Sequence, residues 1–261
     1  MKNQPQKCIA TKRAFGALLF AALLLTGNAA WAAQVAGVVA RLSGPLLAKK
    51  ADGSVKVLGL KSEIESGDTL VSEKNTYAQI KFIDNSEITL RPGTTFKVEN
   101  FSFDEGKPDG DNASYSLVKG GLRSITGLMG KRNKEKFSLK TPTATIGIRG
   151  TTFVAHYVPP PSPDDSRAPG AGKLPMLPPG LHLNVTDGAI IVTNNGGALG
   201  FQAGQFGYVP NLNQPPVIVP DNPNIQFVPP PAFDAGAGPG AGGPLAGAGP
   251  GQENAVDCVV R

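Results

Sequence analysis

Apolar and polar residues alternate with a period of two through most of residues 35–208. Ala78, Ile80 and Phe82 alternate with polar neighbours, and a polar turn follows at residues 84–86 before the apolar positions resume. The pattern of short strand and glycine-containing turn recurs at residues 55–60, 116–125, 136–148, 151–158, 181–192 and 199–209. Because side chains alternate between the two faces of a strand, this pattern predicts an all-β domain of many short strands. The spacing of the strand-glycine-strand units also suggests a wound, solenoid-like arrangement.

Prolines mark the boundaries of this domain. Of the 24 prolines, eight lie in residues 159–179 and eleven in residues 210–250. Proline cannot donate a hydrogen bond to a helix or a sheet, so residues 158–180 are predicted to form an extended insertion. Residues 209–261, rich in proline, glycine and alanine, are predicted to be a disordered tail. The remaining body of about 150 residues is long enough to bury a core without disulfides or metals.

The N-terminus has the pattern of a secretory signal peptide. Residues 1–13 are polar and basic, residues 14–26 are apolar, and Ala30 and Ala32 place small residues at the usual cleavage positions. The alternative is an uncleaved anchor, but the apolar run is shorter than the roughly 20 residues that span a bilayer. We therefore expect a signal peptide at residues 1–32 and a periplasmic or secreted mature protein with no transmembrane segment.

Two cysteines are present, and the first, Cys8, would leave with the signal peptide. Cys258 would then have no partner in its own chain, so no internal disulfide is expected. The thiol could stay free or form an intermolecular bridge.

Few residues in the chain could carry enzymatic chemistry. His156 and His182 lie in strand patterns on either side of the insertion, and a paired histidine site is conceivable there because strand ends flanking a loop can be neighbours. We favour surface or hydrogen-bonded histidines. Residues 127–131 lack the spacing of a phosphate-binding loop, and no nucleophile motif is present. The sequence predicts no catalytic residue, no metal site and no cofactor, and hence no enzyme.

Basic residues are concentrated in one stretch. The formal net charge is +5, and the signal peptide carries four of these charges. Residues 119–149 have a net charge of +7, and the rest of the mature chain has −6. The candidate partner-binding residues in this stretch are Lys119, Arg123, Lys131, Arg132, Lys134, Lys136, Lys140 and Arg149. Lys134, Lys136 and Lys140 would share one side of a strand.

This basic stretch is open to two interpretations. One is a solvated hairpin whose lysines discourage edge pairing. The other is a contact for an envelope protein, an anionic glycan or lipid head groups. Nucleic acid is not expected as a partner after export, and the stacking aromatics that it needs are absent.

An ordered set of motifs resembles the FecR domain. The set comprises a G-D-x-L step, a strand-turn-strand hairpin at residues 78–98, a T-P-x-A strand leading into R-G-T-x-F at residues 141–153, and a late pair of strands ending in L-x-x-G-Q. The matching residues are Gly67, Asp68, Asp84, Ser86, Thr141, Pro142, Arg149, Gly150, Thr151, Phe153, Gly188 and Gly204. The resemblance covers residues 35–208 and implies an all-β periplasmic domain similar to a twisted solenoid of short strands.

In well-known FecR proteins this domain is the outer half of a membrane-spanning anti-sigma regulator that receives a signal from an outer-membrane transporter. This chain departs from that plan, because no anti-sigma segment precedes its hydrophobic stretch. Asn85 replaces the usual turn glycine, and asparagine tolerates a positive φ. We expect the motif residues to be mainly structural. Arg149 could bind a carboxylate inside the protein or on a partner.

The sequence therefore predicts an exported, non-enzymatic FecR-domain protein that acts as an interaction or sensing module of the cell envelope. The alternative is an envelope or extracellular structural protein that binds anionic polysaccharide.

Overall fold

The computed structural model describes residues 34–161, 177–221, 223–225 and 227. The expected signal peptide, both cysteines, the middle of the expected insertion and most of the expected tail lie outside these residues. Within them, no helix is both long enough and apolar enough to cross a membrane.

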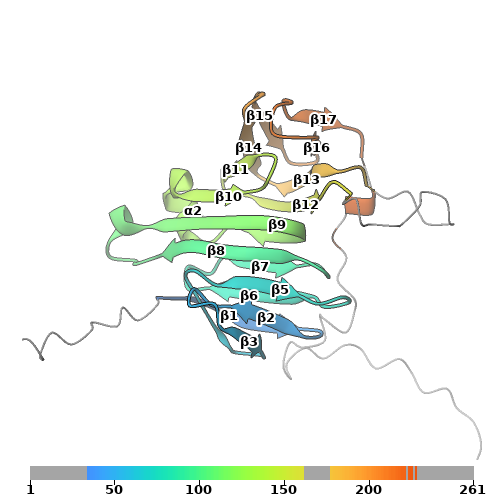
Figure 1. The fold of residues 1–261 in the computed structure, drawn as a ribbon. Helices are drawn as coiled ribbons and strands as arrows, with labels where there is room; N and C mark the ends of the chain where they lie inside the picture. Colours follow the sequence, from blue (N-terminus) through green and yellow to red (C-terminus); the bar gives the residue numbers. More distant parts are fainter. Residues whose placement is uncertain (1–33, 162–176, 222, 226, 228–261) are drawn as a thin grey trace, which may run out of the picture.

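In the described part of the chain, the 17 strands are hydrogen-bonded into one connected sheet that consists of two ladders (Figure 1). The first, ladder A, contains in order of pairing β4 (Glu63–Glu65), β1 (Val35–Leu42), β6 (Ala78–Phe82), β7 (Glu87–Leu90), the C-terminal part of β9 (Asn112–Ile125), β12 (Thr152–Val158), β13 (Gly180–Asp187), β16 (Phe206–Val209) and β17 (Val217–Val219).

The second, ladder B, contains β3 (Val55–Leu58), β2 (Leu46–Lys49), β5 (Thr69–Ser72), β8 (Thr95–Ser102), the N-terminal part of β9, β10 (Phe137–Lys140), β11 (Thr145–Ile148), β14 (Ala189–Asn194) and β15 (Gly197–Gln202). The long strand β9 belongs to both ladders and joins them.

The chain passes back and forth between the ladders as it advances along the molecule. From β10 onward it does so in antiparallel pairs, with β10 and β11 in ladder B, β12 and β13 in ladder A, β14 and β15 in ladder B, and β16 and β17 in ladder A. Figure 1 shows the strands stacked roughly in sequence order from β1–β3 at one end to β15–β17 at the other. The prediction of an all-β domain is confirmed.

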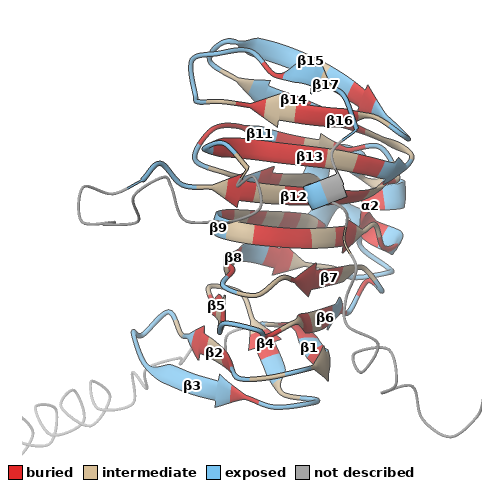
Figure 2. Ribbon diagram, turned by 90° about the vertical axis from the view of Figure 1, so that its right-hand side faces the viewer, coloured by how far each residue is buried: buried red, intermediate tan, exposed pale blue. Residues whose placement is uncertain are grey.

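The core lies between the two ladders. The burial of β6 alternates along the strand, with Ala78, Ile80 and Phe82 inward, as the period-two pattern predicts. Phe82 of ladder A packs against two rings of ladder B, with centroid distances of 5.0 Å to Phe101 and 5.3 Å to Tyr115. The two ladders therefore face each other across one continuous apolar cluster, visible as the buried strand segments in Figure 2.

The prediction of a strand at residues 134–136 is wrong. A short helix α2 (Leu128–Arg132) and a 3-10 turn η2 (Lys134–Lys136) lie there instead, and the strand begins only at Phe137. The reason is topological: β10 pairs with β9 in parallel, so the chain must cross over between them and cannot form a tight hairpin. The crossover also buries Met129, which has 1% of its surface exposed.

The predicted start of a disordered tail at residue 209 is too early. Strand β17 pairs with β16, and the 3-10 turn η3 (Pro223–Ile225) follows it, with Ile225 1% exposed. The ring of Phe227 then packs edge-on against Tyr77 at 6.0 Å and under the guanidinium of Arg91 at 5.7 Å. Three consecutive β-branched residues form a short strand despite the surrounding prolines, because β17 is an edge strand.

The predicted insertion joins two adjacent strands. Strands β12 and β13 pair along their whole length, from Thr152 opposite Asp187 to Val158 opposite Gly180. Residues 158–180 thus leave and re-enter the sheet at one point. The remaining helical turn, η1 (Pro108–Gly110), lies between β8 and β9.

Candidate functional site

The first FecR-like motif residues form a buried ion cluster. Asp68 is 1% exposed, and its Oδ2 accepts hydrogen bonds from Lys50 Nζ at 2.7 Å and from the Glu65 N–H at 2.9 Å. Lys50 Nζ also lies 2.9 Å from Glu65 Oε2. Burial disfavours the charge of Lys50, but the hydrogen bonds to Asp68 and Glu65 outweigh it and raise the pKa of Lys50. Gly67, with φ of 92°, provides the turn that brings these groups together.

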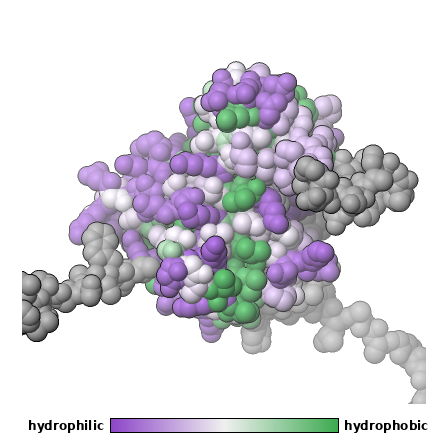
Figure 3. Space-filling view, in the orientation of Figure 1, coloured by the Kyte–Doolittle hydropathy of each residue, from purple (hydrophilic) through white to green (hydrophobic). Residues whose placement is uncertain are grey.

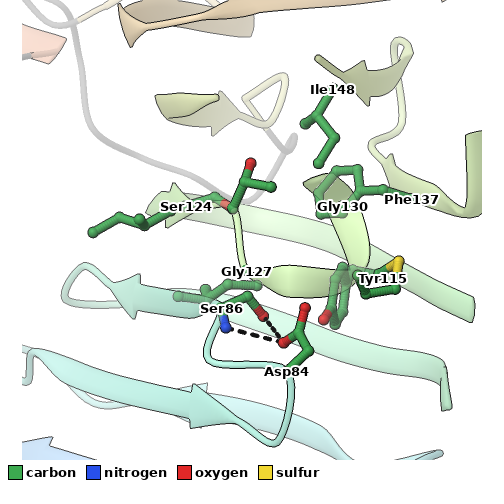
Figure 4. A pocket seen from close by; sticks show the side chains of 12 residues that line it. Asp84, Ser86, Tyr115, Ser124, Gly127, Gly130, Phe137 and Ile148 are labelled. Atoms are coloured by element: carbon green, nitrogen blue, oxygen red, sulfur yellow. Dashed lines mark hydrogen bonds between the residues drawn. The ribbon is translucent and has the colours of Figure 1, made fainter. Parts of the chain in front are cut away.

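Asp84 organises the turn between β6 and β7 (Figure 4). Its Oδ1 accepts hydrogen bonds from the N–H and the hydroxyl of Ser86 at 3.0 and 2.6 Å, and its backbone carbonyl accepts one from the Leu128 N–H at 2.8 Å. Its Oδ2 is buried and has no hydrogen-bond partner in the described residues. The adjoining cavity of about 10 Å³ has room for roughly one water, so it is too small for a larger ligand.

The R-G-T-x-F element anchors one turn to two others. The Thr126 hydroxyl donates to the Thr151 carbonyl at 2.8 Å and accepts from the Thr151 N–H at 2.9 Å, while the Thr151 hydroxyl donates to the Ala189 carbonyl. Gly150 packs directly against Gly188, where a Cβ atom would lie 2.1 Å from the Gly150 oxygen. These motif residues fix the packing of adjacent turns.

The other motif residues also have structural contacts. The Thr141 hydroxyl donates to the Ala144 carbonyl at 2.8 Å and accepts from its N–H at 3.1 Å, closing the turn that contains Pro142. Phe153 is fully buried in the core, and Gly204, with φ of 84°, donates a backbone hydrogen bond to Val185.

Arg132, one of the predicted basic residues, is bound within the protein. Its guanidinium hydrogen-bonds both carboxylate oxygens of Asp111 at 2.7 Å and the carbonyl of Asp104 at 2.6 Å, and it stacks over Phe103 at 4.6 Å. The hydrogen bond from Arg132 lowers the pKa of the buried Asp111 carboxyl. Arg132 therefore holds the β8–β9 loop against α2.

The structure divides the remaining basic residues among several places. Arg123 lies in ladder A, paired with Thr89 and Val154, whereas Lys119 and Lys140 lie in ladder B. Lys131, Lys134 and Lys136 are exposed on α2 and η2. A stretch that is contiguous in sequence is therefore not a single surface.

Arg149 is exposed at the end of β11 and forms no ion pair within the described residues. It borders a shallow hollow of about 240 Å³ on ladder B, with Ile191 and Gly200 on the neighbouring strands.

The two histidines are directly opposite each other on β12 and β13. The sequence analysis held that they could be neighbours, and they are cross-strand partners. His182 Nε2 lies 2.8 Å from the Pro178 carbonyl, and its ring stacks on Tyr208 at 4.8 Å. His156 Nδ1 is buried without a hydrogen-bond partner in the described residues. Among these residues, no group of three histidine, cysteine, aspartate or glutamate side chains could hold a metal ion.

Burial of His156 should make the stability of the protein pH-dependent. Desolvation, with the charges of Arg91 and His182, lowers the pKa of His156 from 6.5 to about 4. Between these values the unfolded chain binds a proton that the folded chain does not, so stability increases with pH. We expect the free energy of unfolding to rise by about 2 kcal/mol from pH 5 to pH 7. Urea titrations at the two pH values measure the free energy of unfolding. The variant His156→Leu should lose most of the difference between the two values. An equal pH dependence in that variant would contradict the assignment.

The end of the molecule nearest the N-terminus exposes an apolar edge. Strand β3 is paired with β2 alone among the described strands, and in Figure 2 it lies largely exposed at the end of ladder B. Val55, Val57 and Leu60 are 62%, 74% and 63% exposed. Figure 3 shows hydrophobic side chains gathered toward this end of the visible face.

Strand β17, at the other end of the molecule, is an edge strand of ladder A, and prolines protect it. Strand β17 lies between Pro216 and Pro220, and prolines at a strand edge oppose the addition of another strand. No proline lies in or next to β3. The edge of β3 is therefore the more accessible of the two to a pairing partner.

Comparison with known proteins identifies one family. Residues 68–162 match the family model described as FecR protein. This segment of the chain is FecR-like. The matched region extends from the Asp68 ion cluster past the R-G-T-x-F turn, so it includes β9 and strands of both ladders, β5 to β12. No curated protein matches the sequence.

Three of the solved structures that match this chain are distant likenesses. Two crystal structures of a "putative anti-sigma factor" from Parabacteroides distasonis ATCC 8503 share 14% identity with it at a TM-score of 0.40. The aligned region covers 58% of this chain and 58% of theirs. A "cell surface anchoring domain" shares 21% identity over 24% of this chain and 82% of its own length, at a TM-score of 0.23.

Proposed function

We propose that this protein is an exported, non-enzymatic interaction or sensing module of the cell envelope that recognises an extended segment of a partner protein at the β3 edge. The FecR domain supports a regulatory or sensing role, since FecR-like proteins are envelope-associated and act through other proteins. The observation that carries the proposal is the exposed apolar edge of β3.

The proposed mechanism is strand addition. An edge strand presents unpaired backbone N–H and C=O groups, and an added strand gains main-chain hydrogen bonds while its side chains meet those of the edge. Val55 and Val57 point to the same face of β3, where they would contact alternate side chains of the partner. The partner segment is thus expected to be extended and apolar on one face.

The twisted solenoid expected from the resemblance would serve as a rigid scaffold for this edge. Its support is the passage of the chain between two ladders around a single core. A continuous core opposes local movement of the end strands, so binding would not require the domain to rearrange.

A photo-crosslinking residue at position 57 tests the proposal. We expect it to capture a defined envelope protein, identified by mass spectrometry, in cells that express the full chain. Val57→Lys, which places a charge on the edge, should weaken binding of that protein about tenfold or more, the range typical of central contact residues.

Val118 offers a matched control. It is a valine that is 48% exposed on ladder B, but it lies on the central strand β9, away from any edge. A crosslinker at position 118 and the variant Val118→Lys should leave the partner unchanged. Equal crosslinking from both positions, or full binding by Val57→Lys, would rule out the β3 edge as the contact.

A further inference from the structure

A single row of residues crosses the whole outer face of ladder B. Cross-strand pairs connect one residue from each of its nine strands: Val55, Lys49, Thr69, Lys97, Ser116, Lys140, Thr145, Thr193 and Ala198. Their chain neighbours Ala48, Leu70, Phe96 and Leu139 are at most 1% exposed. Because neighbouring residues of a strand point to opposite faces, this row faces solvent.

Lysines recur on alternate strands of the row. Lys49 is on β2, Lys97 on β8 and Lys140 on β10, and one strand lies between each lysine and the next. Strands are about 4.8 Å apart, so the lysines follow one another at roughly 10 Å. The hydroxyls of Thr69 and Ser116 fill the positions between them. The row is a polar strip with positive charges at regular spacing.

Little on this face neutralises these charges. Lys49 and Lys140 form no ion pair in the described residues, and Lys97 pairs with Glu99 at 2.5 Å. Both partners of that pair are more than a third exposed, at 39% and 34%, so an anionic ligand can compete for Lys97 at little cost.

We propose that this row binds a linear anionic polysaccharide. Evenly spaced lysines match a chain with repeated negative charges, and hydroxyls between them can donate and accept hydrogen bonds with sugar hydroxyls. A folded protein partner is less suited, since protein interfaces have apolar or aromatic centres depleted in lysine. A single-stranded nucleic acid would need aromatic platforms, and the row has none.

The row begins at Val55 of β3, but the proposal does not depend on strand addition at that edge, because its three lysines lie on β2, β8 and β10. It also differs from the basic stretch at residues 119–149, of which the row contains only Lys140. The other two lysines come from residues 49 and 97, far away in the sequence.

The proposal is tested by measuring the binding of the full chain to polygalacturonate with affinity electrophoresis at low ionic strength. The triple variant Lys49→Gln, Lys97→Gln and Lys140→Gln should bind about tenfold more weakly, since each exposed charge contributes only a few-fold. Glu99→Gln should bind more tightly, because it frees Lys97. Raising the salt concentration should reduce the difference.

A matched control removes three exposed lysines elsewhere: Lys74, Lys81 and Lys131. That triple variant has the same net charge and should bind within about twofold of the unmodified protein. The proposal is overturned if both triple variants weaken equally, if Glu99→Gln binds no more tightly, or if the protein binds anionic lipid vesicles but not polygalacturonate. Circular dichroism of each variant should be unchanged, since none of the substitutions is at a buried position.

Discussion

Replacing Tyr115 by alanine is expected to lower the free energy of unfolding by about 3–5 kcal/mol, the range for removing a large buried aromatic side chain. Tyr115 lies at the centre of the core, 1% exposed, with four phenylalanine rings around it. The centroid distances are 5.3 Å to Phe82, 5.4 Å to Phe96, 6.4 Å to Phe101 and 5.8 Å to Phe137. These rings come from both ladders. The cavity left by the alanine side chain would therefore remove contacts that hold the two ladders together. Urea denaturation monitored by circular dichroism measures the loss.

Tyr115→Phe is the matched control, since it keeps the ring and removes the hydroxyl that hydrogen-bonds Ser86. Its cost should be about 1 kcal/mol, the net contribution of one hydrogen bond. If Tyr115→Ala cost no more than Tyr115→Phe, the aromatic cluster would not be the main contact between the ladders.

Strands could be predicted from the sequence where apolar and polar residues alternate along them. Residues 78–82 show this most clearly, since they alternate inward and outward as the period-two pattern requires, whereas in residues 152–158 Phe153, Val154 and Ala155 are buried in succession. The backbone conformation of a turn could also be predicted where a single residue determines it. Asn85 has φ of 61°, in agreement with the prediction that asparagine replaces glycine at that turn.

The register of the sheet could not be predicted, and the candidate surfaces depend on it. Lys49, Lys97 and Lys140 are far apart in sequence, and only the pairing of β2, β5, β8, β9 and β10 brings them into one row. Lys97 and Lys140 lie in alternating strand patterns that indicate an outward position, whereas no strand was predicted at residues 46–49, which contain Lys49. By contrast, the charge run at residues 119–149 suggested one patch, because a linear reading cannot detect that β9 changes ladder within the run.

Proline content misled the interpretation of the C-terminal boundary. Eleven prolines after residue 209 indicate little regular structure on average. However, proline removes only its own backbone N–H donor, so a strand can still pair through its other residues. Val217–Val219 pairs through one edge, and Ile225 and Phe227 bury apolar surface without needing a strand. A short apolar segment between prolines is thus compatible with an edge strand and a packed extension.

The glycines of the FecR motif have a shared structural explanation. Gly150 of the R-G-T turn and Gly188 of the β13–β14 turn have φ of 65° and 72°, in the left-handed region that favours glycine. The two backbones are in contact on the Gly188 side: a Cβ atom added at Gly188 would collide with the Gly150 backbone, whereas one added at Gly150 would meet no atom within 4 Å. The contact couples ladder A to ladder B, since β12 and β13 belong to the first ladder and β11 and β14 to the second.

Gly188→Ala should therefore be strongly destabilising, by about 3–4 kcal/mol. The left-handed φ alone costs a non-glycine residue about 1–2 kcal/mol, and a Cβ atom 2.1 Å from the Gly150 oxygen adds an overpacking cost of about 1–3 kcal/mol. Gly204→Ala separates the two effects, because Gly204 has φ of 84° but no atom within 4 Å of the added Cβ, so its cost should stay near 1 kcal/mol. Urea denaturation of both variants at one pH measures the difference. Equal costs would mean that backbone conformation, and not the contact between the two turns, accounts for glycine at position 188.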